Sequence, residues 1–196
     1  SQAGMIAHVS AICRSVDVGV IVYNRGTCQL RPDSVARIAE DCPNFVALKD
    51  GLGNIEWLLE MRALVGDRLL FINGMPTAEI HASAYAAMGV PTYSSAIFNF
   101  VPRTAVEFHH AVRDGDAATR DAILRDFLIP YLKIRNRQPG YAVGIVKAGV
   151  DLVGHGAGHV RAPLSDLTAD ERAELSLLIR KLGSQEIPAD IERISA

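Results

Sequence analysis

The sequence lacks several features that would assign it to common classes of protein. None of its apolar runs is long enough to cross a bilayer, and its first residues show no signal-peptide pattern. The 20 basic and 22 acidic residues give a net charge of −2 without a basic stripe, so nucleic-acid binding has no electrostatic support. The 3 cysteines form no C-x-x-C pair, and we expect reduced, packed thiols in a cytoplasmic protein.

The composition that remains is that of an ordinary soluble globular protein. The 196 residues are 49% hydrophobic and 21% charged, which is enough for a substantial buried core. The chain begins at Ser1 without an initiator methionine, and a helical pattern starts almost at once at Met5. We therefore expect that the natural protein is longer and that an amino-terminal portion precedes Ser1.

The first half of the chain alternates between strand patterns and helix patterns. Buried apolar runs predict strands at 18–24, 45–49, 68–74 and 92–96. Amphipathic spacing and capping residues predict helices at 5–15, from 32, at 55–65 and at 76–88. Because the connections are short, this alternation indicates parallel βα units and an α/β fold.

The strand signal stops after Pro102. Helices are predicted at 104–112, 116–135, 141–153 and 169–182, a loop at 154–159, and a fraying polar tail from 184. Four strands cannot close an eight-stranded barrel, so the units form either an open sheet or half of a longer barrel. The abrupt start favours the second half of a (β/α)8 TIM barrel, strands 5–8, at 1–101. A final barrel helix and a C-terminal helical extension would then occupy 102–183, and a flexible tail 184–196.

Lys49 is the most informative single residue. It ends an apolar run, and alternation places it on one face with Phe45 and Ala47. The carboxyl end of a parallel strand is where α/β folds place their chemistry. A partly desolvated lysine has its pKa lowered from about 10.4 and can attack a carbonyl to form a Schiff base. The alternative is a strand-end lysine that pairs with Asp50 or reaches solvent.

Polar clusters follow all four predicted strands and would share one rim. They are Tyr23-Asn24-Arg25, Lys49-Asp50, Asn73-Gly74 and Ser94-Ser95. Tyr23 lies one βα unit before Lys49, and neighbouring strands are about 4.8 Å apart, so the phenol can meet the amine and shuttle protons. Arg25 can clamp a carboxylate through its guanidinium fork. Local packing of the tyrosine and a solvent-facing arginine are the alternatives.

Other motifs carry weaker signals. Ser94, Ser95 and Asn99 can donate to a carboxylate or to hydroxyls, or can satisfy loop backbone. His155 and His159 stand four residues apart in a glycine-rich loop without a carboxylate at ligand spacing, and no metal site is expected. The Gly-x-Gly at 51–53 before a helix is a faint signal for a phosphate site, but the dinucleotide-binding fingerprint is incomplete. The basic cluster at 135–137 suits a solvated or subunit-contact face.

Six sequence runs together resemble the dihydrodipicolinate synthase/N-acetylneuraminate lyase superfamily. They are VYNR (22–25), FVALKDG (45–51), NGMPTAE (73–79), TYSSAIFNFVP (92–102), IRNRQPGYAV (134–143) and VRAPLSDLT (160–168). The members of this superfamily are (β/α)8 barrels that form a lysine Schiff base with a 2-keto acid. The resemblance implies that Lys49 forms the imine and Tyr23 transfers the proton. It also implies the residues that line the pocket: Arg25, Gly74, Ser95 and Asn99.

Within the superfamily, Arg25 follows Tyr-Asn directly, which argues against the branch that condenses aspartate semialdehyde. The resemblance implies a hydro-lyase that dehydrates and decarboxylates a six-carbon keto-diacid, with no metal and no cofactor beyond the covalent imine on Lys49. It further implies a homo-oligomer, dimer or tetramer, with no nucleic-acid or membrane partner. The family's first half barrel and its Gly-Thr-Gly-Glu carboxylate loop are absent from these residues. The alternatives are an aldolase of 2-keto-3-deoxy sugar acids and a non-catalytic half-barrel module.

Overall fold

The structure is a computed structural model that describes residues 1–156 and 158–183, so the predicted tail at 184–196 lies outside the described residues. The chain divides into two compact units, one at Ser1–Ser94 and one that begins at Ser95. Each unit is described by itself. Within the described residues, none of the helices combines the length and the apolar character that a membrane crossing requires.

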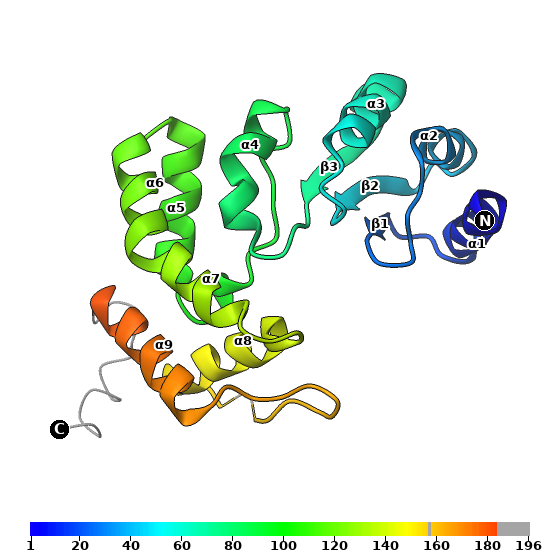
Figure 1. Cartoon of the computed structure of the whole chain (residues 1–196). Helices are drawn as coiled ribbons and strands as arrows, with labels where there is room; N and C mark the ends of the chain where they lie inside the picture. The colour runs from blue at the N-terminus through cyan, green and yellow to red at the C-terminus, as the bar shows by residue number, and fades with distance from the viewer. Residues whose placement is uncertain (157, 184–196) are drawn as a thin grey trace. The chain divides into compact units, whose positions relative to one another are not determined.

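The first unit alternates helices with three parallel strands in the order β1-β2-β3 (Figure 1). Its elements are α1 (Gln2–Ser15), β1 (Val20–Asn24), α2 (Pro32–Asp41), β2 (Phe45–Asp50), α3 (Ile55–Val65), the short turn η1 (Gly66–Arg68), β3 (Leu70–Asn73), the turn η2 (Ala78–His81) and α4 (Ala82–Ala87). The α/β class and the parallel sheet that the sequence predicts are therefore confirmed.

Local chemistry explains where these helices begin. Pro32 occupies the first turn of α2, where its missing N–H leaves no helical hydrogen bond unmade. The Asn54 side chain caps α3 by accepting a hydrogen bond from the Trp57 N–H at 3.1 Å. The Ser1 hydroxyl caps α1 by accepting from the Gly4 N–H at 3.2 Å.

One face of the sheet packs against α1, α2 and α3, which lie on the same side of the strands in Figure 1. Val22, Leu48 and Phe71 are in register across the three strands and belong to this core. The helices contribute Val9 and Cys13 from α1, Val35 and Ile38 from α2, and Leu58 and Met61 from α3. Burial of these side chains stabilises the layer by roughly 25 cal/mol per Å² of apolar surface removed from water.

The opposite face of the sheet is apolar but exposed. Ile21, Ala47 and Leu70 share one register row there, and Ile21 and Leu70 are 54% and 71% exposed. Ala47 between them is only 1% exposed, so the exposed apolar side chains lie on the two outer strands. Large exposed apolar side chains that share one face are typical of a surface that another part of a protein covers.

A bulge in β2 corrects one prediction about this face. The register shifts between Val20, which pairs with Phe45, and Ile21, which pairs with Ala47, so that Val46 is an extra residue. Phe45 therefore belongs to the helix-side core, whereas Ala47 and Lys49 take the other face. The prediction that Phe45 shares a face with Lys49 was wrong, because a bulge breaks the two-residue alternation.

The predicted fourth strand at 92–96 is also wrong. This segment contributes only an isolated parallel bridge between Asn73 and Tyr93, supported by hydrogen bonds from the Asn73 N–H to the Thr92 carbonyl at 2.9 Å and from the Ser94 N–H to the Asn73 carbonyl at 3.3 Å. The segment is short and mostly polar, with Thr92, Ser94 and Ser95 among its five residues, so it offers little apolar surface to support an extended pairing.

The second unit is helical in its described part. Its elements are η3 (Ile97–Asn99), α5 (Pro102–Asp114), α6 (Ala117–Ile123), a π-helical turn η4 (Leu124–Leu128), α7 (Ile129–Arg135), α8 (Tyr141–Leu152) and α9 (Ala169–Lys181). The helix predicted at 116–135 is continuous but widens at η4. Pro130 follows that turn and has no N–H to donate, which accounts for the change in hydrogen-bond spacing.

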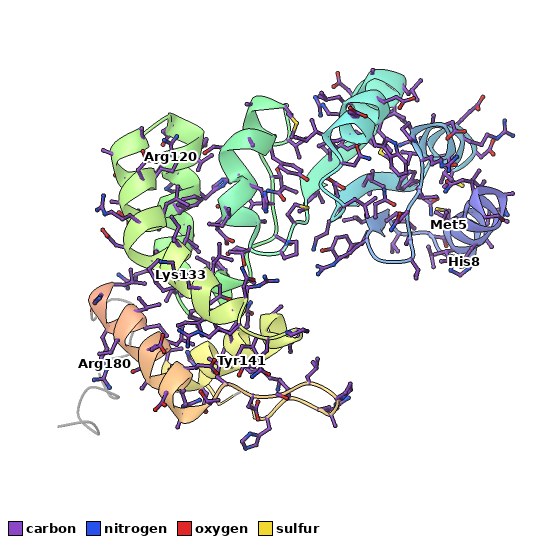
Figure 2. All side chains as sticks on the ribbon, viewed as in Figure 1. Met5, His8, Arg120, Lys133, Tyr141 and Arg180 are labelled. Carbon is purple, nitrogen blue, oxygen red and sulfur yellow. The ribbon has the colours of Figure 1, made fainter. Side chains whose placement is uncertain are left out.

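The core of the second unit is aromatic. The ring centroid of Tyr131 lies 5.9 Å from that of Phe127 and 6.0 Å from that of Phe100. Tyr141, at the start of α8 in Figure 2, is buried and donates to the Glu171 carboxylate at 2.7 Å. The ring contacts thus join α7 to η4 and to the residue after η3, and the hydrogen bond joins α8 to α9.

Candidate active site

The three strands end in two register rows on opposite faces of the sheet. The first row is Tyr23, Lys49 and Ile72, and the second is Asn24, Asp50 and Asn73. The first row continues the exposed face and the second lies on the helix side, because successive side chains alternate. The parallel register thus brings Lys49 directly beside Tyr23, as the sequence predicts.

The amine of Lys49 lies over the ring of Tyr23, with Nζ 4.4 Å from the ring centroid. The Tyr23 hydroxyl donates to the Gly74 carbonyl at 2.5 Å and accepts from Nη1 of Arg25 at 2.9 Å. Lys49 and Tyr23 are both half-buried, whereas Arg25 is exposed. The phenol is therefore held by two partners, and its oxygen lies between a cation and a backbone carbonyl.

Gly74 is required by the closeness of these side chains. A Cβ at this position would lie 2.6 Å from Cγ of Lys49, 2.8 Å from its Cε and 2.8 Å from Cε2 of Tyr23. Real Cβ contacts are essentially never so short, so any other residue would displace the lysine or the tyrosine. Gly51 borders the ring in the same way, because its Cβ would lie 2.7 Å from Cε2 of Tyr23. Its role here is close packing rather than phosphate binding.

The second row fixes the loops that follow the strands. Asn24 is buried, accepts from the Leu30 N–H at 2.7 Å and donates to the Leu30 carbonyl at 3.1 Å. Asn73 accepts from the Met75 N–H at 3.1 Å and donates to the Ala78 carbonyl at 3.0 Å. Each amide thus satisfies backbone groups that strand termination would leave unpaired.

Asp50 performs the same task for the β2–α3 loop. One carboxylate oxygen accepts from the Leu52 N–H at 3.0 Å, and the other accepts from the Tyr85 hydroxyl at 2.5 Å. Burial, then the hydrogen bond and the charge of Asp50, raise the pKa of Tyr85, so its phenol remains a donor. The alternative in which Lys49 pairs with Asp50 is wrong, since the two side chains point to opposite faces and the carboxylate bonds Tyr85.

The remaining predicted pocket residues lie in the second unit. The Ser95 hydroxyl accepts from the Phe98 N–H at 3.1 Å, and the Asn99 amide donates to the Ala96 carbonyl at 2.9 Å. Both side chains therefore satisfy backbone groups around η3, which was one of the alternatives from the sequence. Their place in a substrate pocket stays a prediction.

Two residues of the first unit were missed by sequence reasoning. Tyr85 is buried on α4, and a buried tyrosine generally needs a hydrogen-bond partner, so the lone tyrosine of an alanine-rich helix was the available signal. Thr77 is buried with a φ of 52°, a left-handed conformation that non-glycine residues rarely adopt. No sequence signal indicates the conformation of Thr77.

Over residues 1–156 and 158–183, no group of three or more histidine, cysteine or acidic side chains is arranged to hold a metal ion. His159 does have an acidic neighbour that sequence spacing missed, because its Nδ1 lies 2.8 Å from Oδ2 of Asp166. The hydrogen bond from the Val160 N–H, then the one from His159, lower the pKa of Asp166. This pair closes the loop before α9.

Comparison with known proteins places this arrangement in a family. The model of the Dihydrodipicolinate synthetase family matches residues 1–182. The chain therefore belongs to the dihydrodipicolinate synthetase family, and the family resemblance seen in the sequence is confirmed. Among solved structures, a dihydrodipicolinate synthase from Bacillus anthracis is 26% identical, with a TM-score of 0.76 over 96% of this chain and 61% of that chain.

Curated relatives are closer in sequence. A protein of Pseudomonas putida named 5-dehydro-4-deoxyglucarate dehydratase is 54% identical over 185 residues, and a protein of Leptothrix cholodnii named "Probable 5-dehydro-4-deoxyglucarate dehydratase" is 57% identical over 185 residues. Each alignment covers 94% of this chain and 61% of the relative. The chain thus spans about three-fifths of the length of the curated relatives it matches.

Proposed function

We propose that the chain is part of a 5-dehydro-4-deoxyglucarate dehydratase, a decarboxylating hydro-lyase that produces 2,5-dioxopentanoate, CO₂ and water. The names of the relatives at 54% and 57% identity support the substrate. The observation that carries the proposal is the Lys49 amine, 4.4 Å from the centroid of the Tyr23 ring at the carboxyl end of a parallel strand. An amine at such a position is suited to covalent capture of a ketone.

We propose further that the parallel sheet belongs to the second half of a (β/α)8 barrel. Ile21 and Leu70 are 54% and 71% exposed on the face that carries Lys49, and the interior of a barrel would bury them. Residues 1–101 would supply strands 5–8, with the segment at 92–96 as an irregular last one. Residues 102–183 would supply the final barrel helix and the helical extension.

The reaction would proceed through one covalent imine. The Lys49 nitrogen adds to the ketone beside one carboxylate, and loss of water gives the protonated imine. Removal of a proton from the adjacent CH₂ forms an enamine, whose electron pair expels the hydroxyl from the next carbon as water. The resulting conjugated imine accepts the electrons of the bond to the distal carboxylate, which leaves as CO₂. Reprotonation and addition of water then release the product and free Lys49.

The proposed roles of the side chains follow from the contacts of Tyr23. Its hydroxyl lies between Arg25 and the Gly74 carbonyl, and it would move protons to and from the carbinolamine and the CH₂ group. Arg25 would bind a substrate carboxylate, and Gly74 leaves room beside the amine. Ser95 and Asn99 would complete the pocket. The chemistry needs no metal or cofactor beyond the imine, and we propose a cytoplasmic homo-oligomer, dimer or tetramer, acting on this small keto-diacid.

The test is reductive trapping in the full-length protein. Borohydride added with 5-dehydro-4-deoxyglucarate should leave a stable label on Lys49, located by peptide mapping. A Lys133→Met variant, which removes an exposed amine of α7, should be labelled like the wild type. A label on another lysine, or none, would overturn the proposal. Release of CO₂ rather than pyruvate distinguishes this reaction from that of an aldolase.

A further inference from the structure

We propose that Tyr85 and Asp50 form a positioning pair that holds Lys49 and Tyr23 in the geometry required for imine formation. This inference rests on the proposed Schiff-base function. Neither residue faces the amine. Tyr85 comes from α4, and Asp50 ends β2 on the face opposite to Lys49. Their effect would therefore pass through the backbone rather than through contact with the substrate.

A continuous chain of hydrogen bonds links α4 to the site. The Tyr85 hydroxyl donates to the Asp50 carboxylate at 2.5 Å, and the Asp50 carbonyl accepts from the Gly74 N–H at 2.7 Å. The Gly74 carbonyl in turn accepts from the Tyr23 hydroxyl at 2.5 Å. A shift of Asp50 therefore moves Gly74, and the carbonyl of Gly74 is the acceptor of the proposed proton-transferring phenol.

Asp50 also controls Lys49 through the covalent backbone. The two residues are adjacent in β2. Anchoring the Asp50 carboxylate on one face of the sheet therefore fixes the orientation of the Lys49 side chain on the opposite face. The clearance there is small, because a Cβ on Gly74 would lie only 2.6 Å from Cγ of Lys49. Even a small rotation of the strand end would change the position of the amine over the Tyr23 ring.

The pair is buried and fully bonded, as a fixed support requires. Asp50 and Tyr85 are 5% and 4% exposed, and the second carboxylate oxygen holds the Leu52 N–H. A buried carboxylate that loses one of its two hydrogen-bond donors has an oxygen without a hydrogen bond, and it tends to move toward another donor. Loss of the Tyr85 hydroxyl should thus release the strand end while the aromatic ring still fills its place in the core.

The second unit supplies a matched control. The Tyr141 hydroxyl donates to the Glu171 carboxylate at 2.7 Å, and that carboxylate also holds the Thr168 N–H at 3.0 Å. Both pairs are thus buried tyrosines bonded to a carboxylate that keeps a backbone N–H partner. Only the Tyr85 pair is connected to the Lys49 backbone.

The experiment compares Tyr85→Phe, Tyr141→Phe and wild-type protein, each as the full-length chain. Pyruvate, the simplest 2-keto acid, is mixed with each protein in the presence of sodium cyanoborohydride. Label on the Lys49 peptide is then followed over time by mass spectrometry. Misplacement of a reacting group by ~1 Å can cost up to ~100-fold in rate, and we expect Tyr85→Phe to lower the trapping rate constant about tenfold. Tyr141→Phe should leave it within about twofold of wild type.

The folded fraction of each protein, measured by far-UV circular dichroism before mixing, separates positioning from folding. Partial unfolding lowers the observed rate only in proportion to the unfolded fraction, whereas a misplaced amine lowers the rate constant that remains after division by the folded fraction. An unchanged rate constant in Tyr85→Phe, or an equal fall in Tyr141→Phe, would overturn the positioning role and leave the proposed function intact. Absence of label at Lys49 in the wild type, with pyruvate and with 5-dehydro-4-deoxyglucarate alike, would overturn both.

Discussion

The two register rows at the strand ends lie one residue apart along each strand, yet they differ in exposure and in hydrogen bonding. The row of Tyr23 and Lys49 is half-buried and faces the exposed side of the sheet. The row of Asn24, Asp50 and Asn73 is 1%, 5% and 0% exposed, and each member bonds backbone of the loop that follows. Candidate catalytic residues thus alternate along the strands with residues that hold the following loops, because successive side chains point to opposite faces.

This comparison teaches that a polar residue at a strand end does not by itself indicate function. Polar residues occupy both rows, but only the first row leaves an amine beside a phenol. The hydrogen bonds given for the second row are to backbone groups of the following loops, apart from the one that Asp50 accepts from the Tyr85 hydroxyl. Variants of the first row should therefore change catalysis directly, whereas variants of the second should change stability and, at Asp50, also the position of Lys49.

Lys49→Met gives the largest expected effect. The variant keeps an unbranched side chain over the Tyr23 ring but removes the nitrogen that we propose forms the imine. Trapping with 5-dehydro-4-deoxyglucarate and borohydride should fall to background. The free energy of unfolding should stay within about 0.5 kcal/mol of wild type, as for partly exposed positions. Retained trapping at wild-type rate would place the chemistry on another residue.

Gly74→Ala should come next. The added methyl would lie 2.6 Å from Cγ of Lys49 and 2.8 Å from Cε2 of Tyr23, so both side chains must move. We expect a fall in the trapping rate constant of up to ~100-fold, the cost of ~1 Å of misplacement. Gly4→Ala on α1, where the nearest atom is the Ser1 hydroxyl at 3.3 Å, is the control. A wild-type rate in Gly74→Ala would show that the close packing is unimportant.

Asn24→Ala tests the second row. Loss of the amide leaves the buried N–H and carbonyl of Leu30 unpaired, and such groups cost roughly 1–3 kcal/mol each. We expect the denaturation midpoint to fall while the trapping rate constant of the folded protein changes less than in Gly74→Ala. Asn136→Ala, which removes one exposed contact with Arg135, should change stability by less than about 0.5 kcal/mol. Equal losses in the two variants would contradict the supporting role.

The smallest expected effect concerns pH and lies outside both rows. Hydrogen bonds from Tyr141 and then from Thr168 lower the pKa of Glu171 in the folded chain. A lowered carboxyl pKa means that the unfolded chain binds more protons, so the stability contributed by Glu171 is present above its unfolded pKa and is lost as pH falls through the folded value. The free energy of unfolding, measured by urea titration from pH 6 to pH 3, should therefore fall less steeply with acidification in Glu171→Gln. An unchanged slope would contradict this linkage.

Much of the fold could be predicted from local patterns. The apolar runs of β1, β2 and β3 and the amphipathic spacing of their helices led to the parallel α/β arrangement that the structure has. The adjacency of Lys49 and Tyr23 could also be predicted, because both stand at the carboxyl ends of consecutive strands that pair in parallel. The capping residues Ser1, Asn54 and Thr168 carry similarly local information.

Other features depend on contacts between distant segments, and local patterns missed them. The bulge at Val46 moved Phe45 to the helix side, and the predicted last strand pairs with β3 only through a single bridge at Tyr93. The partner of Asp50 is 35 residues away on another helix, which no spacing rule could have indicated. Each of these features depends on contacts between residues that are distant in the sequence.

The sequence by itself determined the order of helices and parallel strands and the placement of an amine and a phenol on adjacent strand ends. These follow from periodicity, which is a property of the chain taken a few residues at a time. Only the tertiary structure decided that Asp50 turns away from Lys49 to bond Tyr85 and that Gly74 leaves room for the lysine stem. The physical reason is that burial and hydrogen bonding are satisfied by whichever groups the fold brings together, regardless of their distance along the chain.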